Sequence, residues 1–326
     1  MNPRSGNHWK LRGDAAPEKG RATGSLLEGV FPAIHTAFDD EEKIDAERER
    51  QLVRFLLRQG VHGLFVCGTT GEFPVLSLEE REEVAEVVAS EALAVVPIIV
   101  QVGAPRPRDA VRLAQHAARL GVQAISSIPP CYYSYRPDAV FEYIADVASA
   151  TSLPFYYYHI PERTRFFLDE KFVERLLGIP NLVGIKYSHG NFSFLEQMQA
   201  LYGPRLRVFC GMDELFLSSL VSGACGGIGA TYCFLAPLFV SIWTAFRQGD
   251  VEKARLLQAE ANRILAPFSR YPFIAAGKEI LHLLGIDVGL PRLPQSRLEP
   301  EEKTSLRRDL MLAGMKGLEG VAPESA

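Results

Sequence analysis

Short apolar runs alternate with amphipathic helical patterns from about residue 28 to residue 250. Each run is apolar almost throughout, which is typical of parallel strands that are covered on both faces. The runs predict eight strands, at residues 30–36, 63–67, 97–102, 123–128, 154–158, 182–187, 207–210 and 226–231. Eight strand–helix units in roughly 220–250 residues predict a (β/α)₈ barrel. A doubly wound sheet is the alternative, because periodicity does not reveal whether the sheet closes.

Helix signals lie between and after these runs. Ser77 and Glu80 have the spacing of a capping box, and Asp169 is placed to cap a helix that ends near Gly178. After residue 250, helical patterns cover residues 251–265, 275–284 and 301–312, and a proline-containing connector covers residues 286–300. We therefore predict a flexible tail at 1–25, a barrel at 26–250 and a C-terminal helical extension at 251–326.

One stretch, from Leu215 to Phe246, contains no charged residue and is long enough to cross a bilayer. Four glycines and Pro237 interrupt it. We therefore interpret the stretch as a buried helix, a glycine-rich strand and a second helix rather than as a membrane span.

Composition narrows the choice of partners. Among the 326 residues, 35 Lys and Arg face 39 Asp and Glu, so there is no basic excess to neutralise nucleic-acid phosphates. The five cysteines are widely spaced without a CxxC pair, which favours a reducing cytoplasm over a disulfide framework. The histidines are scattered as well, so no metal site is expected. Residues 1–25 lack the apolar core of a secretory signal.

The most unusual strand end is Lys186, which closes an otherwise apolar run. Active residues of such barrels stand at the carboxyl ends of the strands, and lysine is rarely buried without a partner. The period of two places Lys186 and Tyr158 on the same face of neighbouring strands, where they could meet. A desolvated lysine is a nucleophilic amine suited to Schiff-base chemistry, and a nearby phenol can move protons. Alternatively, Lys186 reaches solvent beside a loop.

Two further strand ends carry polar residues. In Gly68–Glu72 (GTTGE), two glycines allow a sharp turn, and two hydroxyls with free N–H groups could hold a small anion. A plain turn explains the same letters equally well. Asp213 and Glu214 could bind substrate hydroxyls, although their spacing alone favours a helix cap.

Four motifs taken together carry a family resemblance: GTTGE at 68–72, YHIP at 158–161, GIK at 184–186 and GGIG at 226–229. With them, the chain from Gly29 to Pro294 resembles the pyruvate-dependent class I aldolases typified by dihydrodipicolinate synthase and N-acetylneuraminate lyase. The resemblance implies a (β/α)₈ barrel with a C-terminal helical extension, usually in a homotetramer. It also implies that pyruvate is held as a lysine imine, without a metal or organic cofactor.

The resemblance assigns roles to individual residues. It implies that Lys186 is the Schiff-base lysine, that Tyr158 moves protons, and that Thr69 and Thr70 hold the pyruvyl carboxylate. Tyr132 matches a tyrosine that reaches into the adjacent subunit's site. Its neighbour Tyr133 is the alternative if the alignment shifts by one residue.

The residues expected to contact the second half of the substrate resemble two different groups within the family. Likeness to N-acetylneuraminate lyases implies sugar contacts from Ser188, Gly211, Asp213, Glu214 and Ile228. Arg163 lies five residues after Tyr158, where dihydrodipicolinate synthases place an arginine that binds a carboxylate, and a guanidinium suits an acidic substrate. Three further departures from the common patterns are Ala230 for a substrate-contacting serine, Arg165 for a loop glycine and Ala37 for a proline.

Several functions are therefore open. The first is a lyase that cleaves a 2-keto acid to pyruvate and an aldehyde, as N-acetylneuraminate lyase does. The alternatives are condensation of pyruvate with aspartate semialdehyde, and a keto-deoxy sugar acid aldolase or dehydratase. A non-catalytic barrel that binds a keto acid belongs to another class, and the pairing of Lys186 with Tyr158 argues against it. Scattered histidines disfavour a metal-dependent hydrolase.

Overall fold

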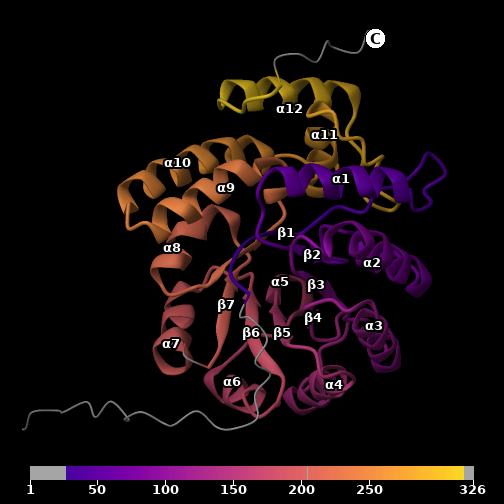
Figure 1. Cartoon of the computed structure of the whole chain (residues 1–326), viewed down its shortest axis with the longest axis vertical. Coiled ribbons are helices and arrows are strands. Elements are labelled where there is room, and N and C mark those ends of the chain that lie inside the picture. Colours follow the sequence, from indigo (N-terminus) through magenta and orange to yellow (C-terminus); the bar gives the residue numbers. More distant parts are fainter. Residues whose placement is uncertain (1–26, 204, 319–326) are drawn as a thin grey trace, which may run out of the picture.

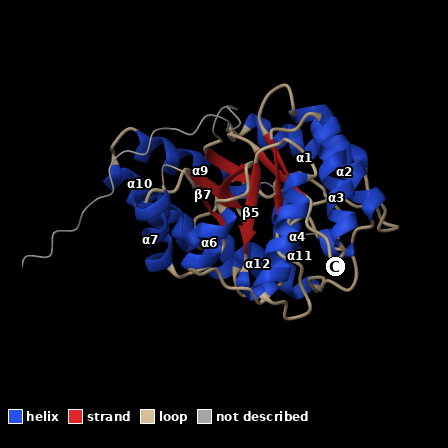
Figure 2. Cartoon of the chain, turned by 90° about the horizontal axis from the view of Figure 1, so that it is seen from below, coloured by secondary structure: helices blue, strands red, loops and turns tan. Residues whose placement is uncertain are grey.

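Parallel strands form the centre of the molecule and helices surround them (Figures 1 and 2), in a computed structural model that describes residues 27–203 and 205–318. The eight strands of this described part are β1 (Gly29–Pro32), β2 (Leu64–Val66), β3 (Ile98–Gln101), β4 (Ala124–Ser127), β5 (Phe155–His159), β6 (Leu182–Tyr187), β7 (Arg207–Cys210) and β8 (Gly226–Gly229). They pair in the order β1-β8-β7-β6-β5-β4-β3-β2. A parallel bridge between Ala33 and Phe65 joins the two outer strands. The sheet therefore curls into a (β/α)₈ barrel, and the doubly wound alternative is wrong.

The helices follow the strands in the predicted alternation. Around the barrel they are α1 (Ala46–Arg58), α2 (Leu78–Ala92), α3 (Pro107–Leu120), α4 (Pro137–Ser149), α5 (Pro161–Thr164), α6 (Glu170–Leu176), α7 (Phe192–Tyr202), α8 (Phe216–Val221) and α9 (Tyr232–Arg247), with 3₁₀ turns η1 (Phe73–Val75) and η2 (Asp213–Leu215). The capping box of Ser77 and Glu80 is present, and the Asp169 side chain accepts from the Phe172 N–H. Both predicted caps are confirmed.

The uncharged stretch folds as predicted, because α8, β8 and α9 lie along it in that order. None of the helices in the described residues combines the length and the apolar character that a membrane crossing needs.

Three helices follow the barrel: α10 (Val251–Phe268), α11 (Phe273–Leu283) and α12 (Pro300–Leu312). Figure 1 shows α10 beside α9, and α11 and α12 stacked beyond α1 at one end of the molecule. The segment between α11 and α12 has no helix, as predicted for the connector. The tail predicted at 1–25 and the last residues of the chain, 319–326, lie outside the described residues.

The barrel interior is filled by large side chains from alternate strand positions, among them Phe31, Phe65, Tyr156, Phe209 and Ile228. The opposite faces of the strands belong to a second cluster that packs against the surrounding helices. This alternation follows the strand period of two. It places Tyr158 inside the barrel as well.

Gly184 makes room for one of these rings. A Cβ at this position would lie 2.6 Å from the ring of Tyr156 and would overlap the carbonyl oxygen of Arg207. A glycine in β6 therefore allows a tyrosine of β5 to fill the barrel.

Candidate active site

Lys186 lies inside the barrel at the end of β6. It stands opposite Tyr158 in the pairing of β5 with β6. Its Nζ lies 4.2 Å from the centroid of the Tyr158 ring and 4.0 Å from that of Phe65. Only 4% of the residue is exposed, so the alternative in which Lys186 reaches solvent is wrong. The period of two correctly predicted the meeting of Lys186 with Tyr158. Phe65 was missed, although it also lies on the inward face of a predicted strand.

Burial controls the chemistry of this amine. Desolvation lowers the pKa of Lys186, while the phenol of Tyr158 and the carboxylate of Asp213 oppose the shift. A lowered pKa raises the fraction of neutral amine at neutral pH. A neutral primary amine beside a phenol can attack a carbonyl carbon and exchange protons with the adduct.

The Gly68–Glu72 loop reaches the same place. The hydroxyl of Thr69 lies 3.4 Å from the phenol oxygen of Tyr158. The loop is a turn in which the Glu72 N–H donates to the Thr69 carbonyl at 3.1 Å. Thr70, next to Thr69, is buried. The loop thus presents one hydroxyl to the Tyr158 side of the site, and anion binding by the two threonines stays a prediction.

Asp213 is held by Thr231, the N-cap residue of α9 just after β8, rather than by its own helix. Its Oδ2 accepts hydrogen bonds from the Thr231 N–H at 2.9 Å and from the Thr231 hydroxyl at 2.6 Å. Asp213 and Glu214 lie within the η2 turn, and neither η2 nor α8 has a side-chain cap, so the helix-cap interpretation is wrong. Burial raises the pKa of Asp213 to about 6, and the bonds from Thr231 oppose that shift. A Cβ on Gly229 would overlap the other carboxylate oxygen, which explains one glycine of GGIG.

The remaining predicted sugar contacts lie at the ends of β6, β7 and β8. The Ser188 hydroxyl is buried, has no hydrogen-bond partner among the described residues, and lies against Gly211. Glu214 is exposed, and Ile228 is buried in the barrel interior. Thr231 was missed by the sequence analysis, since its only signal was its place at the end of the strand predicted at 226–231.

Arg163 and Tyr132 lie in loops rather than inside the barrel. Arg163 is on α5, directly after β5, and its side chain is exposed. Arg165 ends α5 with φ +55°, a left-handed conformation, so the structure explains why glycine is usual there. Tyr132 is 83% exposed, with φ +84°, and its ring packs edge-on against Tyr133 at 5.0 Å. The structure thus brings Lys186, Tyr158 and Thr69 together and leaves Arg163 and Tyr132 exposed.

Within residues 27–203 and 205–318, His, Cys, Asp and Glu form no group of three or more with the geometry of a metal site. All five cysteines are free thiols.

Comparisons with known proteins agree on one family. The model of the dihydrodipicolinate synthetase family matches residues 26–313. An N-acetylneuraminate lyase of Rhizobium meliloti is 37% identical over 281 residues, which cover 86% of this chain and 93% of the lyase.

Solved structures agree with this relationship. A prophage protein of the dihydrodipicolinic acid synthase family from E. coli K12, solved in complex with pyruvate, has a TM-score of 0.84 at 29% identity and covers 89% of this chain and 99% of its own. A catalytic lysine mutant of the sialic acid aldolase of Ruminococcus gnavus has a TM-score of 0.85 at 28% identity, over 88% and 95% of the two chains. With its barrel, its motifs and these matches, the chain belongs to the dihydrodipicolinate synthetase family.

Proposed function

We propose that the protein is a Schiff-base aldolase that cleaves a 2-keto acid to pyruvate and an aldehyde, or forms the acid from them. The observation that carries this proposal is the burial of the Lys186 amine between two aromatic rings, opposite Tyr158 in the strand register. A barrel that only binds keto acids has no need of a desolvated amine, which is costly to bury.

In the proposed mechanism, the neutral Nζ of Lys186 attacks C2 of the keto acid. One proton from the amine and one from the Tyr158 phenol let the carbonyl oxygen leave as water, so a protonated iminium and a Tyr158 phenolate remain. Tyr158 accepts the proton of the C4 hydroxyl while the C3–C4 bond breaks and its electron pair moves toward the iminium. The aldehyde departs, and an enamine of pyruvate remains on the lysine. Protonation at C3 and hydrolysis of the imine release pyruvate. The iminium is the electron sink, so the cycle needs no metal or organic cofactor.

The proposed role of Thr69 and Thr70 is to hold the carboxylate next to the reacting C2. The Thr69 hydroxyl lies 3.4 Å from the Tyr158 oxygen. The loop that binds the carboxylate would therefore also contact the residue that carries the proton. Pyruvate as the common product is supported by the E. coli relative that was solved with pyruvate, and a lysine nucleophile by the sialic acid aldolase whose catalytic lysine was replaced.

For the aldehyde half of the substrate we propose a polyol, as in N-acetylneuraminate. The buried hydroxyl of Ser188 has no hydrogen-bond partner among the described residues and is available to a sugar hydroxyl. Glu214 lies exposed one residue after Asp213. The Asp213 carboxylate already accepts two bonds from Thr231, so we propose that it acts with its second oxygen.

Arg163 favours a second candidate. Its exposed guanidinium makes no ion pair with another residue in the described part of the chain. A free guanidinium suits a carboxylate on the second substrate, as in aspartate semialdehyde.

The first experiment adds pyruvate and borohydride and locates the reduced adduct by mass spectrometry. We expect an adduct on Lys186 and none in Lys186→Ala. A folded wild-type protein that gains no adduct, or gains one elsewhere, would overturn the proposed chemistry. Release of pyruvate from N-acetylneuraminate, compared with consumption of pyruvate with aspartate semialdehyde, then separates the two candidates.

A further inference from the structure

Glu72, the last residue of the GTTGE loop, forms a buried ion pair with the helical extension. Its Oε1 lies 3.0 Å from Nζ of Lys278 on α11, and the side chains of the two residues are 0% and 2% exposed. The Lys278 ammonium also donates to the Leu290 carbonyl at 3.0 Å and lies 4.2 Å from the Phe38 ring centroid. Burial raises the pKa of Glu72 and lowers that of Lys278, while the attraction between the two charges opposes both shifts.

Arg292, in the connector after α11, adds a second tie. Its backbone N–H donates to Oε2 of Glu72 at 3.0 Å. Its guanidinium donates to both carboxylate oxygens of Glu80 at 2.8 and 2.7 Å, and to the Val75 carbonyl at 3.0 Å. The extension therefore holds the end of the loop, the η1 turn after it and the first turn of α2.

The backbone of this loop needs such support. Cys67, directly before the loop, and Glu72, its last residue, have φ +55° and +57°, which are left-handed values that residues other than glycine rarely adopt. Conformations of this kind persist where the surroundings hold them. At the Glu72 end, the Thr36 hydroxyl donates to the Gly71 carbonyl at 2.8 Å, and the carboxylate is bound by Lys278 and Arg292.

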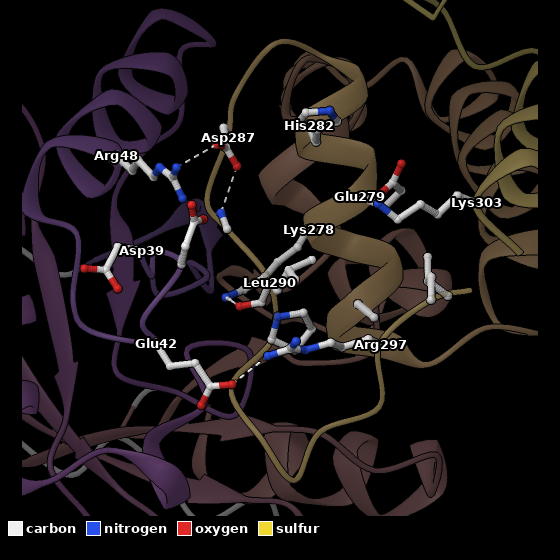
Figure 3. A pocket seen from close by; sticks show the side chains of 15 residues that line it. Asp39, Glu42, Arg48, Lys278, Glu279, His282, Asp287, Leu290, Arg297 and Lys303 are labelled. Carbon is white, nitrogen blue, oxygen red and sulfur yellow. Dashed lines mark hydrogen bonds and ion pairs between the residues drawn. The ribbon is translucent and has the colours of Figure 1, made fainter. Parts of the chain in front are cut away.

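A cavity of about 330 Å³ lies between the extension and the loop from β1 to α1, and Lys278 is one of its lining residues (Figure 3). We call this boundary between the extension and the barrel the seam. Charges pair across this seam: Arg297 with Glu42 at 2.6 Å, and Arg48 with Asp287 at 3.2 Å. Lys278 instead points through the seam toward the GTTGE loop, so it links the extension to the candidate site.

We propose that three residues, Glu72, Lys278 and Arg292, are positioning residues. Through them the helical extension holds the GTTGE loop, and with it Thr69 and Thr70, in place beside Tyr158. None of the three touches substrate in this proposal. The part that concerns pyruvate rests on the proposed function, whereas the part that concerns the loop does not.

The first test measures hydrogen exchange of residues 67–76 in the protein without ligand. The amides of Glu72, Phe73, Val75 and Leu76 are hydrogen-bonded in this segment. We expect Lys278→Met to speed their exchange about tenfold or more, since it leaves the Glu72 carboxylate buried without its cation.

Two controls separate positioning from general loosening. Arg297→Gln removes an exposed pair of the same seam, and Leu306→Ala opens a cavity in α12, where Leu306 is fully buried. We expect both to keep wild-type exchange at 67–76, even where Leu306→Ala lowers the Tm as much as Lys278→Met does. Wild-type exchange in Lys278→Met, or equal loss of protection in Leu306→Ala, would overturn the proposal.

The second test measures how much pyruvate half-saturates the borohydride trapping of Lys186. We expect a rise of about tenfold in Lys278→Met, a smaller rise in Glu72→Gln, and little change in the maximal trapping rate. An unchanged half-saturation in Lys278→Met contradicts the proposal. If that variant does not fold, the double variant Glu72→Gln with Lys278→Met removes both charges of the pair. Wild-type half-saturation in this double variant would also contradict the proposal. A wild-type protein that gains no adduct refutes the proposed function, and the exchange measurement still decides whether the loop is held.

Discussion

Two aromatic faces border the Lys186 amine, with ring centroids of Phe65 and Tyr158 at 4.0 and 4.2 Å. Aromatic faces stabilise an ammonium, while burial destabilises it. The pKa of Lys186 is lowered overall, so burial outweighs the nearby phenol and the Asp213 carboxylate. Burial thus favours the neutral form of the amine.

This balance predicts how stability depends on pH. The pKa of Lys186 is lower in the folded protein than in the unfolded chain, so the unfolded state binds more protons between the two values. Stability contributed by this group therefore rises with pH through that interval. We expect Lys186→Met to be more stable than wild type at neutral pH, with an advantage that shrinks toward about pH 10. Urea unfolding of both proteins at neutral and alkaline pH measures the difference, and an advantage that grows with pH would contradict the assignment.

Tyr158→Phe tests the proton carrier. The substitution keeps the ring beside Lys186 and removes only the hydroxyl that lies 3.4 Å from Thr69. We expect kcat to fall about 100-fold or more and KM to change much less, because proton transfer is lost while packing remains. Steady-state kinetics on a keto acid substrate provide the measurement, and an unchanged kcat removes Tyr158 from the mechanism.

Contacts between residues on neighbouring strands could be predicted from the sequence. Contacts between residues from distant segments could not. A period of two was enough to place Lys186 beside Tyr158. The bonds from Thr231 to Asp213 and from Lys278 to Glu72 join segments whose proximity only the closed barrel and its extension create. The local sequence around these residues does not indicate that they form such pairs.

At the scale of elements, the apolar pattern located every strand but extended some of them. The run at 30–36 was predicted as strand, whereas β1 covers Gly29–Pro32. Ile34, His35 and Thr36 are nonetheless buried. Apolar residues indicate burial and not the backbone hydrogen bonds that define a strand. The predicted strand end is therefore too late where a buried loop follows the strand.

Gly184→Ala tests how β6 is fitted into the barrel. The new Cβ would lie 2.6 Å from the Tyr156 ring and would overlap the Arg207 carbonyl, so strand or ring must move. We expect a loss of about 1–3 kcal/mol in the free energy of unfolding. Gly190→Ala is the matched control, because its Cβ would meet no atom within 4 Å. Chemical denaturation measures the free energy of unfolding of both variants. Equal values would contradict the prediction, because they would show that β6 accepts a Cβ at residue 184 without loss of stability.

For the whole molecule, the sequence predicted the number of strands and the helices after them, but not what the extension does. Closure of the sheet depends on the bridge between Ala33 and Phe65, for which periodicity has no signature. The link between the extension and the GTTGE loop depends on Lys278, and nothing in the sequence of α11 distinguishes this lysine from the other polar residues of the helix.

Assembly is the remaining question at this scale, and the loop after β4 bears on it. Tyr132 and Tyr133 are 83% and 66% exposed there, and large exposed aromatic side chains are typical of interfaces. We propose a homotetramer in which Tyr132 completes the neighbouring subunit's site. Its left-handed φ of +84° makes the loop conformation unusual for a tyrosine.

Tyr132→Phe and Tyr133→Phe test this proposal together. Each keeps its ring, and therefore its packing, while losing one hydroxyl. We expect light scattering to give a tetramer for wild type and both variants, and kcat to fall about tenfold or more in Tyr132→Phe alone. A fall in Tyr133→Phe instead would move the role by one residue. A wild-type monomer with full turnover would exclude a contribution from a neighbouring subunit, because no neighbour would then be present to supply the hydroxyl.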